Sequence, residues 1–155
     1  MKRVLFVCLG NICRSPTAEG VFQRAVEQAG LGGHVSIDSC GVGDWHVGKA
    51  PDQRSQAAAL QRGVDISHLR ARQLSANDFL TFDYVLAMDR DNLQAMRALQ
   101  PIESQAHVGL FLAFAGLPET DVPDPYYGGE EGFEQVLDMI EAASTGLIAE
   151  LARER

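Results

Sequence analysis

The chain has 155 residues, 46% hydrophobic and 22% charged, which suits a single domain over residues 1–155 with a sizeable core. Its net charge of -8 argues against a nucleic-acid or membrane-surface partner, because both favour a basic protein surface. No segment reaches the roughly 18 apolar residues of a membrane span, and three cysteines do not make a disulfide framework. We therefore expect a cytoplasmic protein, and a monomer.

The hydrophobic pattern predicts strands that alternate with helices. The predicted strands cover residues 3–8, 34–39, 83–88 and 107–114. The predicted helices begin near Pro16, run through 57–60, follow Ser75 and Asp89 as caps, and begin near Glu130. This alternation favours a three-layer α/β/α fold around a central four-stranded parallel sheet. Ligands of such folds bind outside the carboxyl ends of the strands.

The stretch Cys8–Ser15 connects the first predicted strand to the first predicted helix, with Ser15 as the expected N-cap. Backbone N–H groups at a helix N-terminus, together with the helix dipole, favour an anion. Gly10 and Asn11 most easily adopt the left-handed backbone that a tight curl needs. The Cys8 loop, residues 8–14, is therefore predicted to be a phosphate-binding loop between strand and helix.

Two side chains of the Cys8 loop carry the expected chemistry. Arg14 can bind two oxygens of one phosphate through its planar guanidinium. Cys8, in the same positive surroundings, is expected to be a thiolate near neutral pH and therefore a nucleophile. The residues expected to bind the phosphate are Leu9, Gly10, Asn11, Ile12, Cys13, Arg14 and Ser15.

Three other interpretations of this loop compete with a phosphate site. Cys8 could simply pack at the end of a buried strand, as many cysteines do. A zinc site is disfavoured because only Cys40 and scattered histidines could complete the four ligands that Cys8 and Cys13 would begin. A nucleotide P-loop lacks its Gly-x-x-x-x-Gly-Lys-Ser/Thr pattern. We therefore expect neither a metal nor a cofactor.

Cys8, five further residues, Arg14 and Ser15 form the C-x5-R-S signature of protein tyrosine phosphatases. The longer string VCLGNICRSP resembles the low-molecular-weight protein tyrosine phosphatase family, and the resemblance spans nearly the whole chain. It implies the same α/β fold and hydrolysis of phosphotyrosine without a metal. It also implies a phosphotyrosine-containing protein as the partner, with a tyrosine kinase among the candidates.

Such a reaction needs an acid to stabilise the leaving oxygen. Asp124 precedes a proline, which on its own could mark only a turn. Asp124-Pro125-Tyr126-Tyr127, however, is similar to the family segment that carries the general acid, so Asp121 is the weaker candidate. The resemblance implies that Cys8 attacks phosphorus, that Arg14 holds the oxygens, and that Asp124 first gives a proton and then activates water.

Other residues are expected to support this chemistry. Ser15 can donate its hydroxyl hydrogen to the Cys8 sulfur, and the resemblance implies that Asn11 locks the loop through a network that includes Ser39. Cys13 could trap an oxidised Cys8 as a disulfide, which in the family is a reversible off-switch. The aromatic residues expected to flank the substrate ring are Trp45, Tyr126 and Tyr127.

One departure from the family pattern concerns His68, which is shifted by one position from the family's usual histidine before Ala71-Arg72-Gln73 and is expected to be an exposed loop residue.

Three rival functions stay open. A thioredoxin-coupled arsenate reductase on the same fold needs two further resolving cysteines, and only Cys40 remains, in the wrong region. A cysteine phosphocarrier of sugar transport would not need Arg14 or an acid such as Asp124. A redox-sensing or anion-binding module without turnover would need only Cys8 and Cys13.

Overall fold

Four parallel strands form one sheet in the order β2-β1-β3-β4. The computed structural model describes residues 1–126 and 130–153. The strands are β1 (Lys2–Cys8), β2 (Val35–Gly41), β3 (Tyr84–Ala87) and β4 (His107–Leu110). All three pairings are parallel, as predicted.

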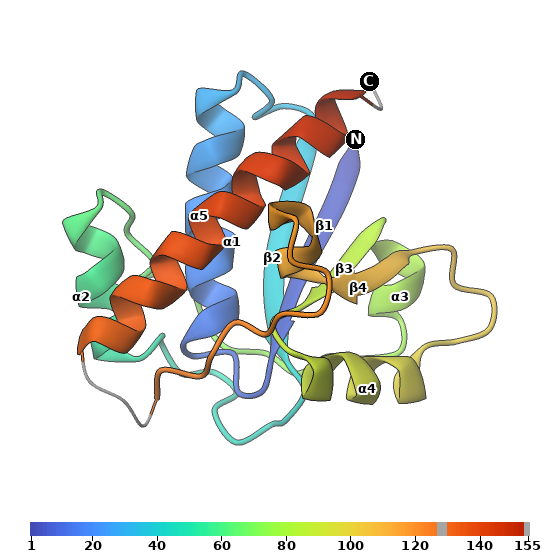
Figure 1. Cartoon of the computed structure of the whole chain (residues 1–155). Coiled ribbons are helices and arrows are strands. Elements are labelled where there is room, and N and C mark those ends of the chain that lie inside the picture. The colour runs from blue at the N-terminus through green and yellow to red at the C-terminus, as the bar shows by residue number, and fades with distance from the viewer. Residues whose placement is uncertain (127–129, 154–155) are drawn as a thin grey trace.

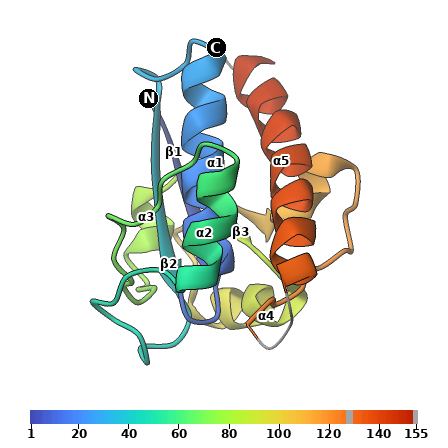
Figure 2. The same ribbon diagram turned by 90° about the vertical axis from the view of Figure 1, so that its left-hand side faces the viewer.

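Helices cover both faces of the sheet, so the predicted three-layer α/β/α fold is confirmed. They are α1 (Arg14–Gln28), α2 (Gln53–Gln61), α3 (Asp78–Thr81), α4 (Arg90–Leu99) and α5 (Glu130–Arg153), with a 3-10 helix η1 (Phe111–Ala115) after β4. Helices α1, α2 and α5 lie on one side, and α3 and α4 lie on the other (Figure 1 and Figure 2).

Strand β1 is buried on both faces, which explains its unbroken apolar run. Phe6 faces the α1 side, where its ring lies 5.6 Å from that of Phe22 and 4.8 Å from that of Phe111. Leu5 and Val7 face the opposite core with residues of α3 and α4. The chain passes from β1 to β2 on one side and later to β3 on the other. The carboxyl end of β1 is therefore the switch point where such folds bind ligands.

Two predicted boundaries were wrong. The fourth strand ends at Leu110 rather than residue 114, because the chain turns into η1 and buries Phe111 in the core. The helix predicted through residues 57–60 is confirmed, and it begins at Gln53, since the Asp52 side chain accepts a hydrogen bond from the Arg54 amide and caps it. The helix expected after Ser75 begins only at Asp78 and is four residues long.

Ser15 is not the N-cap of the first helix, contrary to the prediction. Helix α1 begins at Arg14, and Cys13 precedes it without a side-chain capping hydrogen bond. The Ser15 hydroxyl is instead engaged with the Cys8 sulfur and with Asn11 behind the loop. In the described part of the chain, no helix is long and apolar enough to cross a membrane.

Candidate active site

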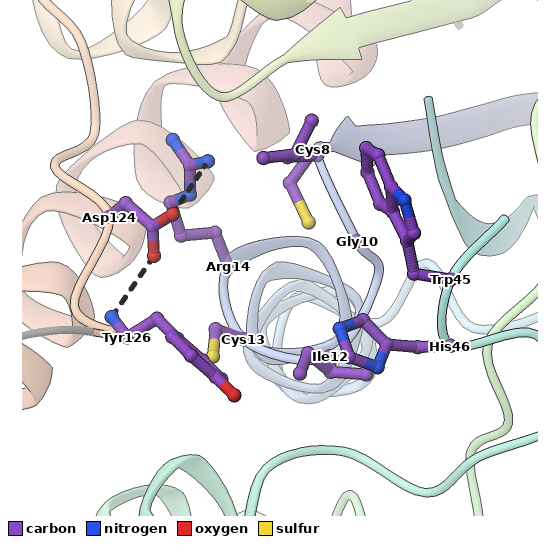
Figure 3. A pocket seen from close by; sticks show the side chains of 10 residues that line it. Cys8, Gly10, Ile12, Cys13, Arg14, Trp45, His46, Asp124 and Tyr126 are labelled. Carbon is purple, nitrogen blue, oxygen red and sulfur yellow. Dashed lines mark hydrogen bonds and ion pairs between the residues drawn. The ribbon is translucent and has the colours of Figure 1, made fainter. Parts of the chain in front are cut away.

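The Cys8 loop forms the floor of a cavity of about 420 Å³ at the carboxyl end of β1. Figure 3 shows the side chains around it. The lining residues are Cys8, Leu9, Gly10, Ile12, Cys13, Arg14, Trp45, His46, Asp124 and Tyr126. Most of the predicted phosphate-binding residues therefore lie together, whereas Asn11 and Ser15 lie behind the loop and do not line the cavity.

The Cys8 side chain ends β1 and is only 3% exposed. Its sulfur lies 3.0 Å from Ser15 Oγ and accepts a hydrogen bond from the Asn11 amide at 3.2 Å. The sulfur therefore meets one backbone N–H donor and one hydroxyl group at the bottom of the Cys8 loop. This geometry suits a nucleophile rather than a cysteine that serves only for packing.

Asn11 holds the curl of the loop. Its backbone has φ of 59°, the left-handed conformation predicted for it. Its side-chain nitrogen Nδ2 donates to Ser15 Oγ at 2.8 Å and to Ser39 Oγ at 3.0 Å. Its side-chain oxygen Oδ1 accepts from the backbone N–H of Arg72 at 3.0 Å. The side chain thus ties the loop to β2 and to the segment after α2, and Asn11, Ser15 and Ser39 form one network.

Arg14 is buried, with 3% of its surface exposed, and is held by two acceptors. Its Nη1 donates to Asp89 Oδ2 at 2.6 Å and to the Val122 carbonyl at 3.0 Å. Burial lowers the pKa of Arg14, but Cys8 and Asp89 more than offset this, and the net pKa is raised. Arg14 therefore stays a cation in a fixed position at the cavity.

Asp124 reaches the cavity from the segment between η1 and α5. One of its carboxylate oxygens lies 3.8 Å from Arg14 Nη2, and the other accepts from the Tyr126 amide at 3.0 Å (Figure 3). This segment is anchored by the Val122 amide, which donates to the Met88 carbonyl at 2.8 Å. Asp124 is more than a turn residue, because its carboxyl group faces Arg14 and the Cys8 loop.

Asp121 is paired elsewhere. It accepts from Arg90 at 3.1 Å, and hydrogen bonds from Arg90 lower its pKa. A carboxylate that is kept ionised is a poor proton donor, and Asp121 does not line the cavity. The choice of Asp124 over Asp121 is therefore supported by their surroundings.

Aromatic side chains form opposite walls of the cavity mouth. Trp45, 65% exposed, stands on one side with His46, and Tyr126 stands on the other (Figure 3). The indole lies over Gly43, where a Cβ atom would come within 2.0 Å of the ring. The absence of a side chain at Gly43 therefore leaves room for the Trp45 ring in this orientation. Tyr127, the third predicted aromatic, lies outside the described residues.

The other two cysteines are buried in different surroundings. Cys13 lines the cavity beside Cys8, and burial raises its pKa to about 12 although Ser55 hydrogen-bonds its thiol. Cys40 is fully buried in the core on the other side of the sheet. The described residues contain no group of three or more His, Cys, Asp or Glu arranged to bind a metal ion, and His68 is exposed on its loop, as predicted.

Three residues with a part in the site were not identified from sequence. Asp89 was predicted only as a helix cap, and its Oδ1 does cap α4 by accepting from the Asn92 amide at 2.7 Å. Its other oxygen, Oδ2, also accepts from Arg14. A polar residue directly after the predicted strand 83–88 was the available signal. His46 lines the cavity, and Gly41 lies against the backbone of the Cys8 loop. Nothing in the sequence indicated those contacts.

The comparisons agree with this geometry. The family model described as low molecular weight phosphotyrosine protein phosphatase matches residues 3–155. A low molecular weight protein-tyrosine-phosphatase of Streptomyces coelicolor is 50% identical over 152 residues, which cover 95% of this chain and 92% of that protein.

Solved structures are similar over nearly their whole length. A protein tyrosine phosphatase from Entamoeba histolytica, with Hepes in its active site, has a TM-score of 0.94 at 37% identity and covers 99% of both chains. A Drosophila arginine phosphatase has a TM-score of 0.87 at 31% identity, with 97% of this chain and 98% of that chain covered.

Proposed function

Since the chain belongs to the low molecular weight phosphotyrosine protein phosphatase family, we propose that it hydrolyses phosphotyrosine in proteins through a phosphocysteine intermediate on Cys8. The family is the one that the string VCLGNICRSP predicted. One observation carries the proposal: a single cavity holds the Cys8 thiol, the Arg14 guanidinium and the Asp124 carboxyl group, although Asp124 lies far along the chain. We propose that the whole chain acts as one catalytic domain.

In the first step, the Cys8 sulfur bonds to phosphorus as the bond from phosphorus to the phenolic oxygen breaks. Arg14 and the loop amides hold the remaining oxygens, and their fixed positions stabilise the charge of the transition state. Asp124, as the carboxylic acid, gives its proton to the departing oxygen. The products of this step are phosphocysteine and a free tyrosine side chain.

In the second step, the Asp124 carboxylate takes a proton from water. The water oxygen bonds to phosphorus as the bond from sulfur to phosphorus breaks, which releases inorganic phosphate and restores the Cys8 thiolate. Ser15 Oγ, 3.0 Å from the sulfur, can stabilise that leaving thiolate by donating its hydrogen. This chemistry requires only side chains and backbone amides of the chain itself.

The walls of the cavity favour an aryl phosphate. Leu9, Ile12, Trp45 and Tyr126 present apolar surface to whatever group carries the phosphate. The guanidinium of a phosphoarginine would need polar or acidic partners, and among the described residues that line the cavity the only carboxyl group is that of Asp124, which the mechanism already uses. We therefore propose phosphotyrosine rather than the substrate named for the Drosophila relative, and expect clearly slower turnover of phosphoarginine.

Cys13 is proposed to protect Cys8 from oxidation. Peroxide would convert the Cys8 thiolate to a sulfenic acid, and the Cys13 thiol would then displace water from it to form a disulfide. Because its pKa is raised to about 12, Cys13 stays a protonated thiol in the cavity that it shares with Cys8. Peroxide inactivation should be reversed by dithiothreitol in wild type and become irreversible in Cys13→Ala, and equal recovery of both proteins would refute this role.

The rival functions fit the site less well. Cys40 is buried in the core on the other side of the sheet, so it is badly placed to resolve an intermediate of arsenate reduction. A phosphocarrier or a redox sensor would leave the buried Arg14 and the facing Asp124 without a purpose. The three free thiols support a reducing compartment such as the cytoplasm.

The test is turnover of an aryl phosphate by wild type, Cys8→Ser and Asp124→Asn in the presence of EDTA. We expect no measurable turnover by Cys8→Ser and a loss of about 10² to 10⁴ in Asp124→Asn. The loss in kcat/KM of Asp124→Asn, which reports the first step, should shrink when the leaving group is a nitrophenol, which needs little protonation. Activity that survives in Cys8→Ser would end the proposal.

A further inference from the structure

Glu19, on α1, is a partly buried carboxyl group that the proposed reaction does not use. Its Oε1 accepts a hydrogen bond from Ser39 Oγ at 2.7 Å. Ser39 in turn accepts from Asn11, the residue that holds the Cys8 loop in its curled form. Glu19 therefore terminates a chain of hydrogen bonds that leads to the Cys8 sulfur.

The hydrogens of this chain can be counted. Ser39 has one hydroxyl hydrogen, and an ionised Glu19 can only accept it, so Ser39 presents lone pairs to Asn11. The backbone N–H of Arg72 can only donate, so the Asn11 side-chain atom that it contacts must be the oxygen, Oδ1. The other atom of that side-chain amide is therefore the nitrogen, Nδ2. Both hydrogens of that nitrogen are then used, one on Ser39 and one on Ser15.

Ser15 must therefore accept from Asn11, and its own hydrogen is left for the Cys8 sulfur at 3.0 Å or the Cys40 carbonyl at 3.2 Å. The Arg72 amide thus fixes the direction of both Asn11 hydrogen bonds, and an ionised Glu19 fixes the direction of the Ser39 hydroxyl. Bonds aligned in this way strengthen one another in a low-dielectric interior.

We propose that Glu19 is a positioning residue, whose carboxylate holds the Ser39 hydroxyl so that the Ser39 oxygen accepts from Asn11 and keeps the Cys8 loop in its curled form. This inference rests on the proposed phosphatase function. A protonated Glu19 could donate its hydrogen to Ser39 instead of accepting from it, and the hydrogen bond from Asn11 to Ser39 would lose the polarisation that the carboxylate gives it. Asn11 would then be held less firmly in the Cys8 loop, and activity would fall.

The surroundings of Glu19 allow this change to occur near neutral pH. Burial raises the pKa of Glu19 to about 7, and Asp38 of β2 adds to the rise, whereas the Ser39 hydrogen bond and Arg72 oppose it. Glu19 also lines a groove of about 510 Å³, which, among residues 1–126 and 130–153, shares no lining residue with the active-site cavity. The other charged or titratable groups of that groove are Arg24 and Glu27 of α1 and Asp65 and His68 of the segment after α2.

The experiment compares kcat/KM of wild type and Glu19→Gln on one aryl phosphate across pH. Ionisations of the substrate, Cys8 and Asp124 are shared by both proteins and cancel in the ratio of the two values. The ratio of wild type to variant should be near 1 at about pH 5.5 and rise to roughly 2 to 10 at about pH 8, as expected for one lost hydrogen bond to a charged group. Glutamine keeps the size of the side chain, so a purely structural role predicts a ratio that does not change with pH.

Two further variants sharpen the test. Glu27→Gln is the matched control, since Glu27 lies on the same helix and groove but accepts from Gln23 rather than from Ser39, and its ratio should stay near 1 throughout. In a Ser39→Ala background the Glu19→Gln change should add no pH dependence. If Glu19→Gln does not fold, the ratio of wild type to Ser39→Ala should show the same rise with pH.

A flat ratio for both Glu19→Gln and Ser39→Ala would overturn the positioning role and leave the phosphatase proposal intact. Wild type without turnover at any pH would instead refute the phosphatase proposal itself. The rate of Cys8 alkylation by iodoacetamide gives a readout that is independent of turnover, and at about pH 8 it should differ between wild type and Glu19→Gln but not between wild type and Glu27→Gln.

Discussion

Replacing Gly41 by alanine is expected to displace the Cys8 loop. Gly41 is the last residue of β2, and a Cβ atom there would lie 2.9 Å from the Gly10 carbonyl carbon and 3.0 Å from both the Asn11 nitrogen and the Leu9 oxygen. These three atoms are backbone and cannot rotate away. Gly41 cannot retreat either, because its amide donates to the Arg72 carbonyl at 2.9 Å and its carbonyl accepts at 2.8 Å.

The size of the displacement follows from these distances. Ordinary contacts of a Cβ atom begin near 3.4 Å, so the loop must move by about 0.5 Å. A shift of about half an ångström in a positioned nucleophile corresponds to a loss of about 10-fold in kcat/KM. Overpacking of this kind typically also costs about 1–3 kcal/mol of stability.

The assay is kcat/KM on an aryl phosphate, together with urea denaturation of the same samples. Gly33→Ala is the control, because a Cβ atom at Gly33 meets nothing within 4 Å, and it should leave the rate unchanged. Unchanged kcat/KM in Gly41→Ala would show that the loop does not depend on the close approach of β2, and would refute this reasoning.

Three further predictions concern other contacts of the fold and the site. Asp89→Asn keeps an oxygen for the helix cap but removes the negative charge beside Arg14. We expect kcat/KM to fall and urea denaturation to show a loss of about 1–3 kcal/mol in the free energy of unfolding. Wild-type stability in this variant would contradict the prediction. For Glu19 the folded pKa lies above the unfolded value, so ionisation costs stability as the pH rises from 4.5 to about 7. The stability advantage of Glu19→Gln in urea should therefore grow from near zero at about pH 4.5 to at most about 3 kcal/mol at about pH 8, and an advantage that shrinks with pH would contradict it. Gly146→Ala would place a Cβ atom 1.7 Å from the Phe114 carbonyl oxygen. The thermal midpoint should therefore drop by the equivalent of about 3 kcal/mol or more, while kcat/KM of the folded protein changes little. A wild-type midpoint would refute the clash.

The fold and the core of the site could be predicted because their signals are local or repeat along the chain. The apolar run of β1 indicated a strand buried on both faces, and the residues of the Cys8 loop follow it directly. The role of Asp124 came from a short motif that resembles a family segment rather than from any pattern of spacing.

Other features could not be predicted because they depend on contacts between distant segments. A serine before a proline favours an N-cap, but the Ser15 hydroxyl bonds Cys8 and Asn11 instead, and the helix begins two residues earlier, at Arg14 rather than Pro16. The apolar residues after Leu110 suit a strand, yet packing against α5 turns them into η1. Glu19 reads as an ordinary helix residue until Ser39 of β2 is brought beside it.

The central claim is that Cys8 carries the phosphoryl group during turnover. The most direct measurement is mass spectrometry of Asp124→Asn after acid quenching during turnover of a nitrophenyl phosphate. Its leaving group needs little protonation, so the first step stays fast while the weakened second step lets the intermediate accumulate. The account predicts one phosphoryl group on the peptide that contains Cys8, and none in the Cys8→Ser, Asp124→Asn double variant. A phosphoryl group on any other residue, or the same adduct in the double variant, would contradict it.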